Sequence, residues 1–332
     1  MPALSMALIA EAAGFLEGRI RRTPVEPSPG LSRVLGVPAW LKLESLQITG
    51  SFKVRGALFR LSKLSDSERR AGIATCSAGN HGKAVAYAAR ELGVKATVYL
   101  PSNVDESKHR AILGYGAEAV ISKFRGYDDT QAWAQEEAAS SGRTFVHAYD
   151  DDYVMAGNGG SLAAEVLEDA PEARAFVLPV GGGGLSAGFS FYAKEKLRDA
   201  VVVGCQHKGS PGLALSLERG EAVTCMPAIE TAAGGVEGGL GERTFQILKS
   251  RVAGVGLVEE EEIFEGVRWM LDEHQYLIEP SAAVAVAACL KGRVGQLKAP
   301  AAVILSGRNV SLETIERVVR RGAFPAGGRG TA

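Results

Sequence analysis

The sequence predicts an α/β protein built from two parallel sheets, with helices on both faces of each sheet and a cleft between them. Its 332 residues are 46% hydrophobic and 23% charged, the balance of an ordinary globular protein that is long enough for one or two domains. From Gly72 onward, short apolar runs alternate with amphipathic segments, and this alternation occurs in two successive sets. Alternating strands and helices form parallel sheets that helices cover on both faces.

The first set of elements extends from Gly72 to about residue 150. Four apolar runs are expected to form strands: Ile73–Cys76, Ala96–Leu100, Ala119–Ser122 and Thr144–His147. The segments between them are expected to form helices: Asn80–Leu92, Glu106–Gly114 and Asp129–Ser141. Gly93 and Pro101 support two of these boundaries, because glycine commonly follows a helix end and proline interrupts a strand.

The second set follows the same pattern to the end of the chain. Three apolar runs predict strands: Ala175–Val180, Val201–Gln206 and Ala301–Ser306. Five segments predict helices: Val154–Glu168, Leu185–Arg198, Glu260–Glu273, Ala282–Leu290 and Leu312–Arg320. The two sets together therefore predict two α/β units.

Composition argues against several classes of protein. A net charge of −1 gives no reason to expect binding to nucleic acid or to an anionic membrane. Residues 1–22 carry Glu11 and Glu17 among apolar side chains, which favours an amphipathic helix over a signal peptide. No uncharged run approaches the ~20 residues that cross a bilayer. Four scattered cysteines without a C-x-x-C pair favour reduced thiols in a cytoplasmic protein.

Lys53 is the first candidate catalytic residue. It stands in Thr49-Gly50-Ser51-Phe52-Lys53-Val54-Arg55-Gly56-Ala57, with glycines on both sides. A lysine becomes a Schiff-base nucleophile when its amine is partly desolvated and lies close to an aldehyde. The alternative is a solvated surface lysine, as most lysines are.

A second candidate site is the glycine run Gly181-Gly182-Gly183-Gly184, which precedes Leu185 and follows a predicted strand. Glycines allow backbone N–H groups to converge, and a helix N-terminus adds partial positive charge, so this loop suits a phosphate. The run also fits the dinucleotide-binding fingerprint. However, the next strand ends at Gln206, where a dinucleotide fold has an acidic residue for the ribose. A plain glycine-rich turn is the third possibility.

Two more motifs follow predicted strands. Ser77-Ala78-Gly79-Asn80-His81 lies at the turn into a helix, where free backbone N–H groups suit the carboxylate of an amino acid. An ordinary Ser or Asn helix cap would give the same pattern, and His81 could equally line a pocket or start the helix. Ser306-Gly307-Arg308-Asn309 ends the last apolar run.

In this order, the four motifs resemble those of the fold-type II pyridoxal-phosphate enzymes, specifically the serine/threonine dehydratase and serine racemase group. The resemblance covers the chain from about Arg22 to Val310 and implies the fold of the tryptophan synthase β subunit. It implies pyridoxal phosphate bound to Lys53, with Asn80 on the ring hydroxyl. The implied cofactor-binding residues are Phe52, Lys53, Asn80, Gly181, Gly182, Gly183, Gly184, Leu185, Glu279 and Ser306. The implied substrate-binding residues are Ser77, Ala78, Gly79, Asn80 and His81.

Ser306 also bears on the type of reaction, because the resemblance places it at the pyridine nitrogen. An Asp there would keep that nitrogen protonated and make the ring a strong electron sink. A Ser hydroxyl cannot, so prompt loss of a β-substituent is favoured over transamination. Glu279, in Glu279-Pro280-Ser281-Ala282, is expected to support the ring or the lysine.

The resemblance also implies a domain organisation. Residues 1–51 and 151–323 would form a large cofactor-binding domain, and residues 52–150 a small mobile domain inserted into it. Residues 324–332, rich in glycine, are expected to be a disordered tail. One predicted helix and this tail follow the Ser306 motif, so the regulatory domain of biosynthetic threonine dehydratases is not expected here. A homodimer is expected from the family alone.

Several residues depart from the family pattern. Ala78 replaces the second serine of racemases, which protonates the opposite face of Cα, so elimination is favoured. The run from Gly204 to Pro211 has no carboxylate where the family binds a divalent cation, so no metal is expected. Arg308 replaces a glycine, and Ser-Gly-Arg-Asn looks similar to hydroxyectoine-utilisation dehydratases, as does the run Thr231–Val236. Arg308 is either exposed or available to a second substrate carboxylate.

The sequence therefore predicts an ammonia-lyase that converts a β-hydroxy-α-amino acid of the L-threonine or L-serine type into a 2-oxo acid and ammonia. The substrate could instead be a related compound, such as a hydroxyectoine-derived amino acid, 3-hydroxyaspartate or 3-phenylserine. A serine racemase, a β-replacement enzyme and a non-catalytic cofactor-binding protein are also compatible with the motifs. The expected partner is a small amino-acid substrate.

Overall fold

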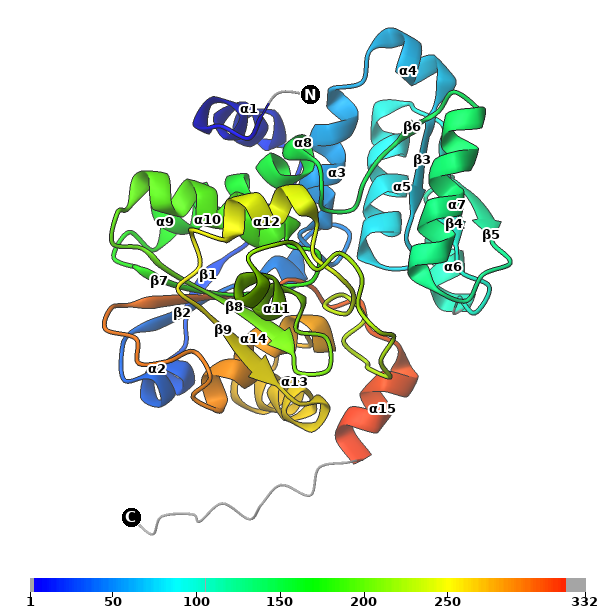
Figure 1. The fold of residues 1–332 in the computed structure, drawn as a ribbon. Coiled ribbons are helices and arrows are strands. Elements are labelled where there is room, and N and C mark those ends of the chain that lie inside the picture. Colours follow the sequence, from blue (N-terminus) through cyan, green and yellow to red (C-terminus); the bar gives the residue numbers. More distant parts are fainter. Residues whose placement is uncertain (1–2, 105, 321–332) are drawn as a thin grey trace.

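The computed structural model describes residues 3–104 and 106–320, and its ribbon is organised around two separate sheets (Figure 1). Both sheets consist of parallel strands, apart from one antiparallel strand at an edge. The predicted α/β class is therefore confirmed. The predicted disordered tail, residues 324–332, lies outside the described residues.

The larger sheet has six strands in the order β1-β2-β10-β7-β8-β9. Every neighbouring pair is parallel except β1 with β2. The strands are β1 (Val25–Pro27), β2 (Ala39–Lys42), β7 (Ala175–Pro179), β8 (Val201–His207), β9 (Gly254–Val258) and β10 (Ala301–Ile304). The last strand in the sequence thus lies in the middle of the sheet, between an early strand and a late one.

Helices cover both faces of this sheet because successive strand residues point in opposite directions. Ala175 and Val177 of β7 belong to one core, with α2 (Pro29–Leu35), α13 (Glu260–His274) and α14 (Pro280–Leu290). Phe176 and Leu178 belong to the opposite core, with helices on the other face. Those helices are α9 (Ser161–Asp169) and α10 (Gly184–Lys196).

The smaller sheet has four parallel strands in the order β5-β4-β3-β6. They are β3 (Ile73–Cys76), β4 (Ala96–Leu100), β5 (Glu118–Ile121) and β6 (Thr144–Phe145). One face packs against α3 (Lys53–Ser62), α5 (Asn80–Leu92) and α6 (Glu106–Leu113). The other face packs against α7 (Tyr127–Ser140).

The remaining helices lie around the two sheets. They are α1 (Met6–Leu16), the 3-10 turn η1 (Glu44–Leu46), α4 (Asp66–Ala71), α8 (Asp152–Met155), α11 (Gly212–Arg219), α12 (Glu242–Leu248) and α15 (Leu312–Arg320). The expected helix in residues 1–22 is α1, with Leu8, Ile9, Ala12 and Leu16 buried. Within residues 3–104 and 106–320, no helix is long and apolar enough to span a bilayer.

The predicted continuous helix Val154–Glu168 is wrong, because a π-helical segment, Ala156–Gly160, separates α8 from α9. The cause is close packing between the π-helical segment and α10. A Cβ atom on Gly159 would lie 2.0 Å from the carbonyl oxygen of Leu185, and one on Gly188 would lie 2.1 Å from that of Met155. The backbone therefore widens where two helices meet without intervening side chains.

Candidate functional site

The candidate residues gather where the carboxyl ends of the strands in the two sheets face each other. Such edges are the usual ligand sites of open α/β sheets. Lys53, the first residue of α3, donates from Nζ to the carbonyl oxygen of Ala148, 2.9 Å away, just beyond the end of β6. The structure thus places the predicted catalytic amine between residues that follow strands of both sheets.

Lys53 has an unusual amine. Its Nζ lies 5.4 Å from the centre of the buried Phe52 ring. Removal from water disfavours the charged form and lowers the pKa of Lys53 to about 8, although the nearby carboxylate of Glu279 opposes this change. A substantial fraction of the amine is therefore neutral near physiological pH, as a nucleophile or proton acceptor requires.

Gly181–Gly184, here called the glycine loop, connects β7 to α10. Gly183 has φ +92°, a conformation that favours glycine. A Cβ atom on Gly182 would lie 2.4 Å from the ring of Tyr149, so only glycine allows this close approach. Among the described residues no side chain caps α10, and its first N–H groups are therefore available to an anion.

The loop Ser77–His81 connects β3 to α5, as predicted. The interpretation as a Ser or Asn helix cap is wrong, because Gly79 is the N-cap and the described residues provide no side-chain cap bond. Instead, Ser77 Oγ accepts a hydrogen bond from the backbone N–H of Gly79, at 3.2 Å. Ala78 lies in the same turn and is partly exposed.

His81 is buried, with Nε2 3.3 Å from the carbonyl oxygen of Val146. A carbonyl only accepts, so Nε2 carries the hydrogen and Nδ1 presents its lone pair. That Nδ1 is buried and has no hydrogen-bond partner among the described residues. Burial, followed by the charge of Lys53, holds the pKa of His81 well below its usual range, so the ring is neutral.

Asn80 and Glu279 are brought together across the two halves of the site. Asn80 Nδ2 donates to Glu279 Oε1, at 2.7 Å. Glu279 is the N-cap of α14 and is only 6% exposed. It lies close enough to Lys53 to influence its pKa, in keeping with the expectation that Glu279 supports the lysine.

Ser306 is buried two residues beyond the end of β10. Its carbonyl oxygen accepts a hydrogen bond from the backbone N–H of Phe52, at 3.1 Å, and Gly307 forms a bridge with Ser51. The Ser306 motif thus lies beside the Lys53 motif. Leu185 also belongs to this region, since it packs in the same core as Phe52.

Three further residues line this region, and the sequence patterns assigned a role to none of them. His147, after β6, accepts hydrogen bonds at Nδ1 from the N–H groups of Tyr149 and Asp150. Tyr149 packs against the glycine loop. Asn309 donates to Asn80 Oδ1, at 2.6 Å. His147 and Tyr149 follow the end of a strand in the smaller sheet. That position was the only feature of the sequence that could have indicated that they line the site.

Gln206 and Arg308 have structural roles. Gln206 is buried; its Oε1 accepts from the N–H groups at the start of α11 and its Nε2 donates to Val180. Arg308 is half-buried and donates from Nη1 to the carbonyl oxygen of Ser45, at 2.6 Å. No group of three or more His, Cys, Asp or Glu residues in the described part of the chain could hold a metal ion. The absence of a cation remains a prediction.

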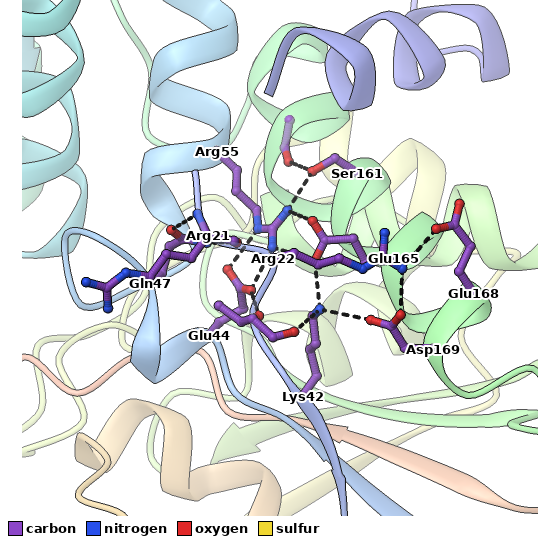
Figure 2. Close-up of polar contacts among 12 residues, drawn as sticks. Arg21, Arg22, Lys42, Glu44, Gln47, Arg55, Ser161, Glu165, Glu168 and Asp169 are labelled. Carbon is purple, nitrogen blue, oxygen red and sulfur yellow. Dashed lines mark hydrogen bonds and ion pairs between the residues drawn. The ribbon is translucent and has the colours of Figure 1, made fainter. Parts of the chain in front are cut away.

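A buried ionic network lies behind α3 (Figure 2). The guanidinium of Arg55, two residues after Lys53, forms paired hydrogen bonds with Glu44, both at 2.8 Å. It also donates to both carboxylate oxygens of Glu165 on α9, at 2.7 and 2.8 Å. Lys42 donates to Glu165 Oε2 at 2.7 Å, and Lys42, Glu44 and Arg55 are fully buried. These bonds fix the start of α3 to the larger sheet.

Comparison with known proteins identifies the family of this chain. A family model described as pyridoxal-phosphate dependent enzyme matches residues 16–307. An L-threonine ammonia-lyase of Geobacter sulfurreducens is 38% identical over 324 residues, covering 98% of this chain and 80% of the relative. Maize serine racemase superposes with a TM-score of 0.90 at 28% identity, covering 96% of this chain and 98% of the other.

A bacterial threonine deaminase, from T.th., superposes with a TM-score of 0.84 at 35% identity, covering 93% of this chain and 99% of the other. The two solved structures share the fold of this chain, with two different reactions in their names. The chain belongs to the fold-type II pyridoxal-phosphate-dependent enzymes, in the group of serine and threonine dehydratases and serine racemases, and pyridoxal phosphate is its cofactor.

Proposed function

We propose that this enzyme is an ammonia-lyase that eliminates water from a β-hydroxy-α-amino acid of the L-threonine or L-serine type. The product is a 2-oxo acid, and ammonia is released. The observation that carries the proposal is the Lys53 amine, whose pKa is lowered to about 8 between the Ser77–His81 loop and the glycine loop. Relatives named L-threonine ammonia-lyase, at 35–38% identity over nearly the whole chain, support it.

The glycine loop fits the phosphate of the cofactor. A Cβ atom at Gly181 would lie 2.4 Å from the carbonyl oxygen of Gly235, and one at Gly184 would lie 2.9 Å from Tyr149. The backbone is therefore packed closely on one side, while the start of α10 offers N–H groups and partial positive charge. We infer that Gly181–Gly184 and Leu185 hold the phosphate without a cationic side chain.

The other predicted residues fit the remaining parts of the cofactor. Lys53 would bind its aldehyde carbon, with Phe52 packed beside it, and Asn80 would donate to the ring hydroxyl. Ser306 would meet the ring nitrogen, and Glu279 would hold the amide of Asn80 in place. Bound pyridoxal phosphate supplies an electron sink that makes the Cα proton of the substrate acidic.

Lys53 then acts on the substrate as a base. In its neutral form, the Nζ atom accepts the Cα proton, and the lowered pKa makes this form available near neutral pH. The N–H groups of Ser77–His81 at the start of α5 hold the substrate carboxylate. The electron pair left on Cα forms the Cα=Cβ bond as the β-hydroxyl takes up a proton from the cofactor phosphate or a bound water and leaves as water. The released enamine is then hydrolysed by a second water molecule to the 2-oxo acid and ammonia.

A serine racemase is the second candidate, because maize serine racemase is a neighbour with a TM-score of 0.90. Racemisation needs acid–base groups on both faces of Cα, whereas elimination needs one. The methyl side chain of Ala78 can neither donate nor accept a proton. This difference favours elimination as the main reaction of this chain.

The test is to add pyridoxal phosphate to the purified protein, record its visible absorption, and follow 2-oxo acid and ammonia. L-Serine, L-threonine, the 3-hydroxyaspartates and 3-phenylserine form the substrate panel. We expect an absorption band that changes on substrate addition, with equal amounts of both products. Lys53→Ala is the control, and full activity in that variant would refute the mechanism.

The panel also addresses substrate choice and Arg308. Because the Arg308 guanidinium donates to Ser45, turnover of 3-hydroxyaspartate would require it to leave that carbonyl. We therefore expect the neutral substrates to react faster. Other expectations stay predictions: a homodimer, a cytoplasmic location, and division into a large domain (1–51 and 151–323) and a small mobile domain (52–150).

A further inference from the structure

Four side chains form a continuous hydrogen-bonded relay that ends beside Lys53. Lys83 Nζ donates to Asn309 Oδ1, at 2.9 Å. Asn309 Nδ2 donates to Asn80 Oδ1, at 2.6 Å, and Asn80 Nδ2 donates to Glu279 Oε1, at 2.7 Å. The relay thus joins α5, the segment after β10 and the N-cap of α14. The family resemblance assigns no role to Lys83 or Asn309.

Groups with only one hydrogen-bonding role fix the direction of this relay. An ammonium only donates, so Asn309 must present its oxygen to Lys83. The carbonyl oxygen of Thr49 only accepts, and it receives a second bond from Asn309 Nδ2, at 2.9 Å. An ionised carboxylate also only accepts, so Asn80 must present its nitrogen to Glu279. If either amide turned over, oxygen would face oxygen.

Two glycines make room for the relay. A Cβ atom on Gly50, which has φ +79°, would lie 2.6 Å from Asn309 Oδ1. A Cβ atom on Gly307 would lie 2.5 Å from Glu279 Oε1. Both glycines belong to the motifs that carry Lys53 and Ser306. The backbone of the site is therefore shaped around these polar side chains.

We propose that Lys83 and Asn309 are positioning residues that hold the amide of Asn80 with its nitrogen toward Glu279 and the cofactor ring. An amide nitrogen has two hydrogens, so Asn80 Nδ2 can donate to Glu279 and to one further acceptor. The proposal rests on the proposed function, in which that acceptor is the ring hydroxyl. Lys83 and Asn309 act through Asn80 and contact neither cofactor nor substrate.

The first test compares Lys83→Met with Lys83→Gln, two side chains of similar length that both suit a helix. Met cannot donate to Asn309, whereas the amide nitrogen of Gln can. The dissociation constant of pyridoxal phosphate from each apoenzyme is measured by fluorescence titration. We expect a rise of about tenfold for Lys83→Met, the worth of one good hydrogen bond, and recovery to near wild type for Lys83→Gln. Equal affinity in wild type and Lys83→Met would refute the role of Lys83.

The second test reverses the relay. In Asn309→Asp, both oxygens of the introduced carboxylate accept, so Asn80 must turn its nitrogen toward that carboxylate and its oxygen toward Glu279. We expect cofactor affinity to fall by at least about tenfold and the unfolding temperature of the apoenzyme to drop. In Asn309→Asp with Glu279→Gln, the glutamine amide can donate to the turned Asn80, so both bonds of Asn80 can form in the opposite direction. The bond to the Thr49 carbonyl is lost in both backgrounds.

The double variant separates positioning from structural support, with Glu279→Gln alone as its reference. We expect Asn309→Asp to cost less thermal stability in the Glu279→Gln background than in wild type. The loss of cofactor affinity should persist in both backgrounds, because Asn80 still presents its oxygen. Recovery of affinity together with stability would show a merely structural role and refute the proposal.

The outcomes also separate this proposal from the proposed function. A wild-type apoenzyme that binds no pyridoxal phosphate would refute both. The relay alone would be refuted by two results together. The wild-type protein would bind the cofactor and release ammonia, and the Asn309→Asp variant would bind pyridoxal phosphate with unchanged affinity.

Discussion

Burial and a nearby negative charge shift the pKa of Lys53 in opposite directions. Burial lowers the pKa of the amine to about 8 from 10.5, and the carboxylate of Glu279 limits the shift. The folded protein therefore releases this proton more readily than the unfolded chain does. One pKa unit corresponds to about 1.4 kcal/mol, so the charged amine costs the fold at most roughly 3.5 kcal/mol. Solvent that reaches the half-buried side chain reduces this cost.

The first prediction follows from the sign of that shift. Between pH 8 and pH 10.5 the unfolded chain binds more protons at Lys53 than the fold does, so the stability of the apoenzyme gains a rising contribution. Well below pH 8 both states hold the proton and the slope vanishes. Lys53→Met should exceed wild type in free energy of unfolding at pH 7, and this advantage should shrink as pH rises to 10.5. Urea unfolding of both apoenzymes measures it, and a constant difference would contradict the assigned pKa.

The second prediction concerns Ala78. A hydroxyl at this position would supply a proton-transfer group on a second face of Cα, and such groups typically contribute at least about a hundredfold to a rate. Ala78→Ser should therefore raise the ratio of racemised to deaminated L-serine by about tenfold or more. Chiral chromatography of residual serine, together with ammonia release, gives the ratio. Ala78→Gly is the control, and an unchanged ratio in Ala78→Ser would refute the account of Ala78.

Some site residues could be predicted from the sequence and others could not. Lys53, Asn80, Gly181–Gly184 and Ser306 stand in short motifs at strand ends, and the structure brings these motifs together. Asn309 is part of the Ser306 motif, but only its distance to Asn80 reveals a purpose. Lys83 looks like an ordinary helix-surface lysine, since its partner is more than two hundred residues away in the chain.

At the scale of single elements, α3 has different surroundings on its two sides. One side carries Arg55 into the buried ionic network, and the opposite side carries Lys53 into the candidate site. Successive helix residues are about 100° apart, so Lys53 and Arg55 point to nearly opposite sides. Arg55 and Lys42 together pair with Glu44 and Glu165 (Figure 2). Arg55, Lys42 and Glu44 are fully buried. A buried carboxylate that loses its partner is strongly destabilising.

The third prediction is that Arg55→Met lowers the free energy of unfolding by about 3–5 kcal/mol, because the buried carboxyl group of Glu44 is left without a cationic partner. Arg90→Met is the matched control, since Arg90 and Glu91 form an exposed pair on α5. That control should change stability by less than about 1 kcal/mol. Urea unfolding compares the two variants, and similar effects in both would show that the buried network does not stabilise α3.

Elements were predictable where local pattern and tertiary contacts agree. The bounds of β3, β4, α5 and α15 match their predictions residue for residue. Strand β9 was missed because Gly254-Val255-Gly256-Leu257-Val258 has the glycines of a loop, and its pairing with β8 gives it order. The π-helical segment was missed because contacts with α10 create it. The sequence of Ala156–Gly160 has no periodicity that indicates these contacts.

At the scale of the whole molecule, the two sheets differ in how far apart their strands lie in the sequence. The smaller sheet uses residues 73–145 alone, and β3 pairs with β4 across roughly 20 residues. In the larger sheet, β2 pairs with β10 across roughly 260 residues. Closing the longer loop costs roughly 2 kcal/mol more in chain entropy.

The fourth prediction is that the smaller sheet forms first during refolding, because local contacts form faster than distant ones. Pulse-labelling hydrogen exchange should show protection at the amides of β3 and β4 before those of β10. The amides of β7 and β8 provide an internal reference within the larger sheet. Protection of β10 before β3 would contradict this order.

The central position of β10 also affects the protein while the ribosome is still making it. Strand β10 lies between β2 and β7, so neither neighbour finds its partner on that side until β10 has been synthesised. At about 5–20 residues per second, translation from β2 to β10 takes on the order of 10–50 s. For that time the nascent chain exposes the unpaired edge of β2, and that of β7 as well once β7 has been made. Such edges are sites for mispairing with other chains. Chaperone binding during translation should therefore be strongest in this interval and end when β10 emerges.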